Sequence, residues 1–421
     1  MLTSGQTIPL AIEKPAAGGR MIARVEGQVV LVADAIPGER VQARVERIGK
    51  GVVYAQTMTV EERSADRRDP FPDPLCGGCL YSHIAYPRQL ELKAQVIADA
   101  FKRIGRLELP AEVAVAASPE QGYRMRARFH VRGHRLGFFR ENSHEVCDAR
   151  TTRQLLPATA DTLDHLMAAM RSLGVESVRE IELSENVDAS ERVVFLDSGL
   201  AIGEAALARM ADTGGLTGLG SAWGAFGSPH VTDALAIGED RITLRRHVQA
   251  FFQGNRFLLG GLVSHVAAQL PETSTVLDLY AGVGLFSIAA GVARRASVVA
   301  VEGDLFAADD LQANAAAAGG AAVTTLRAPV ESIGAGLSAA GRRFDVVIVD
   351  PPRTGLSREA LDNALQVRAP RLIYVSCDVA TLARDARRIV DDGYAVARAD
   401  AFDLFPNTPH VETVVVFDRR V

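Results

Sequence analysis

Three residues that can do covalent and acid–base chemistry lie at the ends of strand-like runs in the last third of the sequence. Asp350 ends the run FDVVIVD, Cys377 ends RLIYVSC, and Glu412 begins ETVVVFDR. Alternating strand and helix patterns from residue 276 onward predict a parallel sheet, whose strands end at one common edge. If the last strand runs antiparallel, it starts at that edge, and Glu412 faces Cys377. The sequence therefore predicts a thiol and two carboxylates in one site.

A glycine-containing loop follows the first strand of this predicted sheet. The stretch VLDLYAGVG, residues 276–284, leads into an apolar helical segment. Glycines let the backbone approach a ligand, and a helix start offers unpaired N–H groups. Glu302, 20 residues after Gly282, closes the next strand and could accept hydrogen bonds from ribose hydroxyls. Ser287 stands where a dinucleotide site has its third glycine, which favours S-adenosylmethionine; a purely structural turn is the alternative.

A thiol, a carboxylate and a methyl donor together suggest methylation of carbon 5 of uracil. That carbon becomes nucleophilic after a thiolate attacks C6, which Cys377 could do. Glu412 could then remove the C5 proton so that the thiol leaves. We expect Asp378 to cap a helix beginning near Val379, and the helix start to lower the pKa of Cys377. Taken singly, Cys377 could be a buried apolar residue and Glu412 a surface charge.

Basic residues concentrate in one stretch, although the whole chain has a formal net charge of −5. Residues 1–150 hold 22 Lys and Arg against 18 Asp and Glu, so this part alone is basic. Its richest stretch contains Arg124, Arg126, Arg128, Arg132, Arg135 and Arg140. Arginines at alternate positions line one face of a strand. That face is either a solvated surface or a contact for RNA phosphates.

Three regions of different character divide the chain. Residues 1–62 hold valine-rich runs separated by turns, which predicts a small β-barrel. Residues 63–246 predict a central α+β domain, in which a helical segment at 86–110 could pack on the catalytic domain. Residues 247–421 predict the α/β catalytic domain. The sequence has no leader pattern and no apolar run approaching the ~20 residues that span a bilayer, so we expect a soluble, cytoplasmic protein without membrane contact.

Five ordered motifs give the chain a resemblance to the RNA uracil-C5 methyltransferase family. They are FFQGN, LDLYAGVGLFS, VDPPRTG, YVSCDVATLARD and LFPNTPHVETV, beginning at residues 251, 277, 349, 374 and 404. The resemblance covers nearly the whole chain. It implies a Rossmann-like, class I adenosylmethionine-dependent methyltransferase domain and an N-terminal TRAM-like, RNA-binding barrel. It makes Cys377 the nucleophile and Glu412 the base, and it gives the methyl donor contacts with Gln253, Tyr280, Glu302 and Asp350. Leu285 stands where some relatives have a polar residue.

The resemblance also implies an iron–sulfur cluster, for which the chain offers one cysteine too few. Cys76, Cys79 and Cys147 match three cysteines of the family pattern, and Asp69 stands close to the place of the fourth. A carboxylate can ligate iron, although thiolate is the usual ligand. We expect a 4Fe–4S cluster with Asp69 or another oxygen ligand. The alternatives are a three-iron cluster, no metal, or zinc bound with the help of a histidine, either His83 or His144.

The expected function is the formation of 5-methyluridine in a structured RNA by a monomeric enzyme. The cluster-bearing branch of the family mostly modifies large-subunit rRNA, which favours 23S rRNA, with tRNA as the first alternative. An amino-group methyltransferase would need neither Cys377 nor Glu412, and it usually has an aromatic residue where this chain has Arg353. A non-catalytic RNA-binding or assembly factor is the third possibility. The target nucleotide depends on RNA shape and stacking and is not encoded in a motif.

Overall fold

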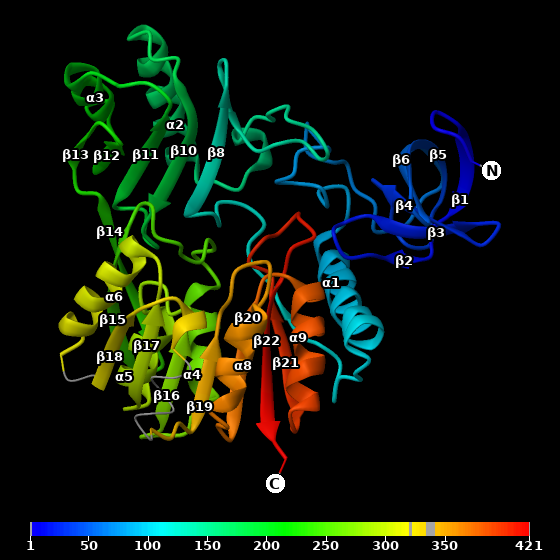
Figure 1. Ribbon diagram of the computed structural model, residues 1–421. Coiled ribbons are helices and arrows are strands. Elements are labelled where there is room, and N and C mark those ends of the chain that lie inside the picture. The colour runs from blue at the N-terminus through cyan, green and yellow to red at the C-terminus, as the bar shows by residue number, and fades with distance from the viewer. Residues whose placement is uncertain (1, 320–321, 334–341, 421) are drawn as a thin grey trace.

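Three β-sheets of six or more strands and one two-stranded hairpin organise the chain in the computed structural model (Figure 1). The structure describes residues 2–319, 322–333 and 342–420. Along the chain, an N-terminal sheet is followed by a central sheet and then by the largest sheet, which holds the last strand of the chain.

The N-terminal sheet is made of short strands whose alternate side chains turn inward. In sheet order the strands are β1 (Thr7–Ala11), β5 (Arg40–Gly49), β6 (Val52–Glu62), β4 (Gln28–Ala33), β3 (Met21–Val25) and β2 (Lys14–Pro15). In β5, Val41, Ala43 and Val45 are buried, whereas Arg40 and Arg44 are exposed. This period of two is that of a strand with one face in a core.

Helix α1 (Tyr86–Ala100) joins the N-terminal sheet to the largest sheet (Figure 1). Its Leu92 belongs to the buried cluster under the N-terminal strands. Its Ile97, with Phe101 in the π-helical turn Phe101–Gly105 that follows, belongs to a cluster on the largest sheet. The helix therefore packs against both parts and fixes their relative position.

The central sheet has a helical layer on one face. Its strands, in order, are β13 (Gly224–Gly227), β12 (Gly218–Ser221), β11 (Arg192–Ser198), β10 (Val178–Glu185), β8 (Arg126–Arg132) and β9 (Arg135–Gly137). The helices of this part are the 3-10 turn η2 (Arg150–Thr152), α2 (Pro157–Ser172) and α3 (Glu204–Ala211). Leu163 and Leu166 of α2 share a buried cluster with Phe129 and Ile181 of the sheet. Burial of this apolar face holds the central part together.

The largest sheet has eight strands and carries the chemistry-bearing residues. In order they are β18 (Ala322–Arg327), β17 (Ser297–Glu302), β16 (Thr275–Leu279), β19 (Val346–Val349), β20 (Arg371–Ser376), β22 (Glu412–Arg419), β21 (Tyr394–Phe402) and β7 (Val115–Ala116). The last strand, β22, pairs antiparallel with both of its neighbours, and the other pairings are parallel. The expected antiparallel orientation of the last strand is confirmed. The edge strand β7 comes from the central segment and was not expected.

Helices cover both faces of this sheet. They are α4 (Leu259–Ala268), α5 (Leu285–Ala293), α6 (Leu305–Ala317), the 3-10 turn η3 (Val330–Ser332), α8 (Arg358–Gln366) and α9 (Val379–Asp391). Apolar residues of α4, α5 and α6 share one buried cluster, and those of α1, α8 and α9 share the other. Strand residues point alternately into the two clusters, as in a sheet that is buried on both sides.

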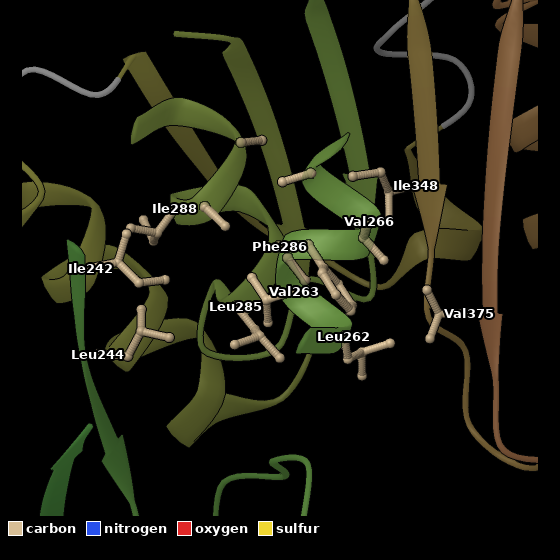
Figure 2. Close-up of a cluster of buried hydrophobic side chains, with 14 of the residues drawn as sticks. Ile242, Leu244, Leu262, Val263, Val266, Leu285, Phe286, Ile288, Ile348 and Val375 are labelled. Atoms are coloured by element: carbon tan, nitrogen blue, oxygen red, sulfur yellow. The ribbon is translucent and has the colours of Figure 1, made fainter. Parts of the chain in front are cut away.

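The hairpin of β14 (His230–Ile237) and β15 (Asp240–His247) packs in the core of the largest sheet. Figure 2 shows Ile242 and Leu244 of β15 in the same buried cluster as Leu262 of α4 and Phe286 of α5. A domain boundary at residue 246 would separate this hairpin from the core that it completes. No helix among the described residues is long and apolar enough to cross a membrane.

Candidate active site

Cys377 and Glu412 face each other at one edge of the largest sheet. Strand β20 ends at Ser376, β22 begins at Glu412, and their antiparallel register pairs Ser376 with Thr413. The next step of that register sets Cys377 opposite Glu412. Only 1% of Glu412 is exposed, and Cys377 is partly buried. The structure therefore brings together the thiol and the carboxylate that the sequence singled out.

The helix after Cys377 begins as expected but does not lower the pKa of the thiol. The Asp378 carboxylate caps α9 by accepting a hydrogen bond from the Thr381 N–H at 2.8 Å. Burial, together with the charges of Glu412 and Asp350, nevertheless raises the pKa of Cys377 to about 12. The expectation of a lowered pKa was wrong, because desolvation and two acids outweigh one helix end.

Asp350, after β19, is the third acid of this site. Burial raises its pKa to about 7, and the charge of Asp278 adds to that effect. Gln253 Nε2 lies 3.4 Å from Asp350 Oδ2 and lowers the pKa slightly by hydrogen bonding. Burial also raises the pKa of Glu412 well above its ordinary value, with Asp350 as the next cause. Closely spaced buried acids resist simultaneous ionisation, so this site retains protons at neutral pH.

Arg353 supplies positive charge among these acids. Its charge acts to lower the pKa of Cys377 and of Glu412, against the effect of burial. In the sequence, Arg353 stood out only as a non-aromatic residue where amino-group methyltransferases usually have an aromatic one. The sequence feature that could have indicated Arg353 as a site residue is its position in VDPPRTG, shortly after the strand that precedes Asp350.

The loop after β16 forms an open cradle of backbone. Tyr280, Gly282 and Gly284 have positive φ values of 62°, 56° and 96°. The Glu302 carboxylate accepts hydrogen bonds from the N–H groups of Gly282 and Asp304, each at 2.7 Å. A Cβ added to Gly282 would meet no atom within 4 Å, so the space beside this residue can take a ligand.

Beneath the cradle lies a carboxyl group with an unused oxygen. Asp278 is fully buried, and its Oδ2 accepts a hydrogen bond from Ser287 Oγ at 2.5 Å, whereas no partner is described for its Oδ1. Burial raises the pKa of Asp278 to about 7. Tyr280 lies above, and its hydroxyl donates to Glu331 Oε1 at 3.2 Å. Glu331, which the sequence did not indicate, thus orients one of the expected ligand-binding residues.

Part of the arginine-rich stretch is paired with carboxylates of the same domain. Arg126 and Arg128 both contact Glu182 on the neighbouring strand β10, at 3.2 and 2.8 Å. Arg140 contacts Asp73 and Glu145. Three of the six arginines of this stretch are therefore paired with local carboxylates, and an RNA contact of the stretch stays a prediction.

Arg124, just before β8, lies close to the active-site loop. Its Nη1 donates to Gln154 Oε1 at 2.8 Å, and its guanidinium lies 5.1 Å from the ring centre of Phe138 and 5.9 Å from that of Phe405. Its backbone forms a bridge with Asn255 of the FFQGN motif. It is the arginine of this stretch that the structure places beside the loop before Glu412.

The three candidate metal ligands gather in one buried cluster, but two of them are bonded to each other. Cys76 and Cys147 form a disulfide, and Cys79 is a buried free thiol beside them. Burial raises the pKa of Cys79 to about 12, with the Asp73 charge as the next cause. Within the described ranges, no group of three or more His, Cys, Asp or Glu side chains is arranged to hold a metal ion.

The other proposed ligands lie elsewhere. Asp69 is exposed, whereas Cys76, Cys79 and Cys147 are buried, so its role as a fourth ligand stays a prediction. His83 is buried against the N-terminal part, where its ring contacts the Ala35 carbonyl at 3.2 Å. His144 is exposed and lies edge-on to Phe139. The zinc alternative therefore finds no histidine in the described cysteine cluster.

Comparisons with known families match two parts of the chain. Residues 225–420 match the family described as tRNA (Uracil-5-)-methyltransferase, and residues 2–58 match the TRAM domain. The first match includes the β14–β15 hairpin, in agreement with its packing in the core of the largest sheet.

Individual proteins show similarity over almost the full length. The 23S rRNA (uracil(1939)-C(5))-methyltransferase RlmD of Pseudomonas putida is 32% identical, over 98% of this chain and 94% of its own. An uncharacterized RNA methyltransferase of Gloeobacter violaceus is also 32% identical, over 99% and 98% of the two chains. Among solved structures, the Pyrococcus abyssi tRNA (uracil-54, C5)-methyltransferase in complex with S-adenosyl-L-homocysteine has a TM-score of 0.76 at 23% identity. It covers 97% of this chain and 99% of its own, so the two proteins share their fold.

Proposed function

The chain belongs to the RNA uracil-5-methyltransferase family, and from this premise we propose that it forms 5-methyluridine in 23S ribosomal RNA. Family membership makes the protein an RNA (uracil-5-)-methyltransferase, so the amino-group and non-catalytic alternatives are set aside. The ribosomal substrate is supported by the RlmD relatives, which are similar over nearly the whole chain. The N-terminal TRAM match supports an RNA partner.

The opposition of Cys377 and Glu412 across β20 and β22 is the observation that carries the mechanism. The Cys377 sulfur bonds to C6 of uracil, and the electron pair of the C5–C6 double bond moves to make C5 nucleophilic. After C5 has taken the methyl group, the Glu412 carboxylate removes the C5 proton. The electrons of that C–H bond reform the double bond, and the sulfur leaves. Glu412 begins β22 and Cys377 directly follows β20, so the pairing of these two strands brings the residues together.

Arg353 favours the reactive form of both groups. Its charge lowers the pKa of the Cys377 thiol and of the Glu412 carboxyl, in opposition to burial. A thiolate is the attacking form of cysteine, and a carboxylate is the proton-accepting form of glutamate. We therefore assign Arg353 the role of favouring the ionised form of either Cys377 or Glu412 in a site where burial favours the protonated forms.

The methyl donor is S-adenosylmethionine, which supplies an electrophilic methyl group when bound. The residues of the cradle fit this ligand: the side beside Gly282 is open, and Glu302 lies at the end of the adjacent strand. Glu302 would hold ribose hydroxyls. Tyr280, Gln253 and Asp350 would contact the rest of the donor, and the unused Oδ1 of Asp278 is a further acceptor under the loop.

The iron–sulfur cluster implied by the family resemblance does not fit the described arrangement. Cys76 and Cys147 are bonded to each other, and Asp69, the candidate for the fourth ligand, is exposed. A cluster would need both thiolates free and a further ligand. No step of the proposed reaction passes through this part of the chain, and the role of the cysteines is structural.

Methyl transfer from labelled S-adenosylmethionine tests the proposal. Unmethylated 23S rRNA and total tRNA are offered separately, and nucleoside mass spectrometry identifies the product. We expect 5-methyluridine in the ribosomal RNA alone. A tRNA substrate is the second candidate, favoured by the fold shared with the Pyrococcus abyssi enzyme, and labelling of tRNA alone would establish it. A methyl group on any atom other than C5 would overturn the proposed mechanism.

A further inference from the structure

The segment between β21 and β22, residues 403–411, ends directly before Glu412. Several side chains from other parts of the chain form hydrogen bonds with it. We call it the base loop. Its first residue, Asp403, is fully buried and accepts a hydrogen bond from Lys93 of α1 at 2.5 Å. Lys93 also donates to the carbonyl of Phe405 at 3.2 Å. The start of the loop is therefore fixed to α1 by a buried ion pair, which is costly to bury unless its geometry is well satisfied.

Asn407, in the middle of the base loop, forms hydrogen bonds with α1 and with residues of the segment 67–84. Its backbone N–H donates to Gln89 Oε1 of α1 at 2.9 Å, and its carbonyl accepts from the Tyr81 N–H at 2.8 Å. Its side-chain Oδ1 accepts from Gln89 Nε2 at 2.9 Å and from Arg68 Nη2 at 2.7 Å. Asn407 has a φ of +63°, a conformation that asparagine, aspartate and glycine adopt more readily than other residues.

Arg68 connects this asparagine to the segment that holds the cysteines. Its Nε donates to the carbonyl of Ser82 at 2.9 Å, and the Ser82 N–H donates to the carbonyl of Cys79 at 2.9 Å. Arg68 also forms an ion pair with Glu120. A continuous chain of hydrogen bonds thus runs from Cys79 through Ser82 and Arg68 to Asn407.

From this geometry we propose that Asn407 is a positioning residue, through which α1 and the segment 67–84 hold the base loop and place the Glu412 carboxylate for proton removal from C5. The proposal rests on the proposed function, since it needs Glu412 as the base. It gives the cysteine-bearing segment a task that requires no electron transfer. It also separates two steps of the reaction, because Cys377 directly follows β20 and lies outside the base loop.

A displaced base delays only the steps after methyl transfer. Asn407→Ala removes the acceptor for Arg68 and Gln89, so we expect the methylated RNA to stay joined to Cys377 at least tenfold longer. The rate of the first methyl transfer should change less than threefold. Single-turnover reactions with methyl-labelled S-adenosylmethionine and 23S rRNA measure both rates, because the covalent adduct migrates slowly in a denaturing gel.

Three variants distinguish the effect of losing the side-chain acceptor from the effects of backbone strain and of general instability. Asn407→Asp keeps the oxygen that accepts both bonds and should resolve the adduct at a nearly normal rate. Asn407→Gly suits the positive φ but has no acceptor, so it should behave like Asn407→Ala. Asn186→Ala is the matched control: this asparagine is also buried and makes three side-chain hydrogen bonds, but none reaches the base loop.

The outcomes distinguish this proposal from the proposed function. A wild-type protein that methylates no uridine would refute the function itself. An active wild type refutes the positioning role if Asn407→Ala slows methyl transfer and adduct release equally, or if Asn407→Gly behaves like the wild type. If Asn407→Ala does not fold, Arg68→Met decides, because the Arg68 side chain is 33% exposed and its loss removes the contacts with Asn407, Ser82 and Glu120 while those of Gln89 and Lys93 with the base loop remain. Normal adduct release by Arg68→Met would then overturn the proposal.

Discussion

The resting thiol of Cys377 should be protonated far above neutral pH. Its pKa of about 12 lies three units above the ordinary value of 9.0. At pH 8 this leaves about 1000-fold less thiolate than an unperturbed cysteine would have. A thiolate of higher pKa is intrinsically more nucleophilic, so each remaining thiolate reacts roughly 20-fold faster. Alkylation of Cys377 by iodoacetamide should therefore be about 50-fold slower than alkylation of the same residue in urea-unfolded protein.

Peptide mapping by mass spectrometry measures this rate residue by residue between pH 7 and pH 10. The rate should rise about tenfold per pH unit without reaching a plateau, because the whole range lies below the folded pKa. Glu412→Gln should accelerate alkylation, since it removes a carboxylate that raises the pKa of Cys377. A plateau below pH 9 would show that the helix after Asp378 dominates over burial, and would refute this reasoning.

Three further predictions concern the two catalytic residues and the cysteine cluster. Glu412→Gln should slow product release by about 10²- to 10⁴-fold and leave methylated RNA joined to the protein in a denaturing gel. Cys377→Ala should abolish methyl transfer while changing the RNA dissociation constant less than about threefold, because phosphate contacts supply most of the affinity. Protein isolated in air should contain two titratable thiols, Cys79 and Cys377, and no stoichiometric iron. Anaerobic protein with about three or four irons per chain would instead restore the implied cluster.

The position of the site could be predicted from the sequence because it depends on strand order. Asp350 and Cys377 each follow a buried parallel strand, and such strands end at the same edge. Glu412 could be placed opposite Cys377 once the last strand was taken as antiparallel, which the pairing of β20 with β22 confirms. The cap by Asp378 is local in sequence and was equally predictable.

Charge pairing between distant segments could not be predicted. The alternation of Arg126 and Arg128 correctly indicates one strand face, but Glu182 lies more than fifty residues away and faces both of them across the sheet. A pattern shows which side chains share a face and does not show what covers that face.

The pKa of Cys377 was mispredicted for a related reason. A helix start is visible in the sequence, whereas burial is a property of the assembled fold. The free-energy cost of desolvating a thiolate grows with the amount of protein that surrounds it. A helix N-terminus stabilises the thiolate by only about 1 kcal/mol or less. The same assembly places Asp350 and Glu412 beside the thiol, and both oppose its ionisation.

The protonated resting state of this site has a consequence for the order of events. Cys377, Glu412 and Asp350 lie close together, and Arg353 provides the countercharge that lowers the pKa of the first two. The single positive charge of Arg353 can stabilise one anion at a time. It therefore favours the Cys377 thiolate during attack and the Glu412 carboxylate during proton removal. When sulfur bonds to C6, its negative charge passes to the uracil enolate, and methyl transfer to C5 then neutralises that charge. The Arg353 charge is thereafter free to favour ionised Glu412, so methyl transfer prepares the base for proton removal.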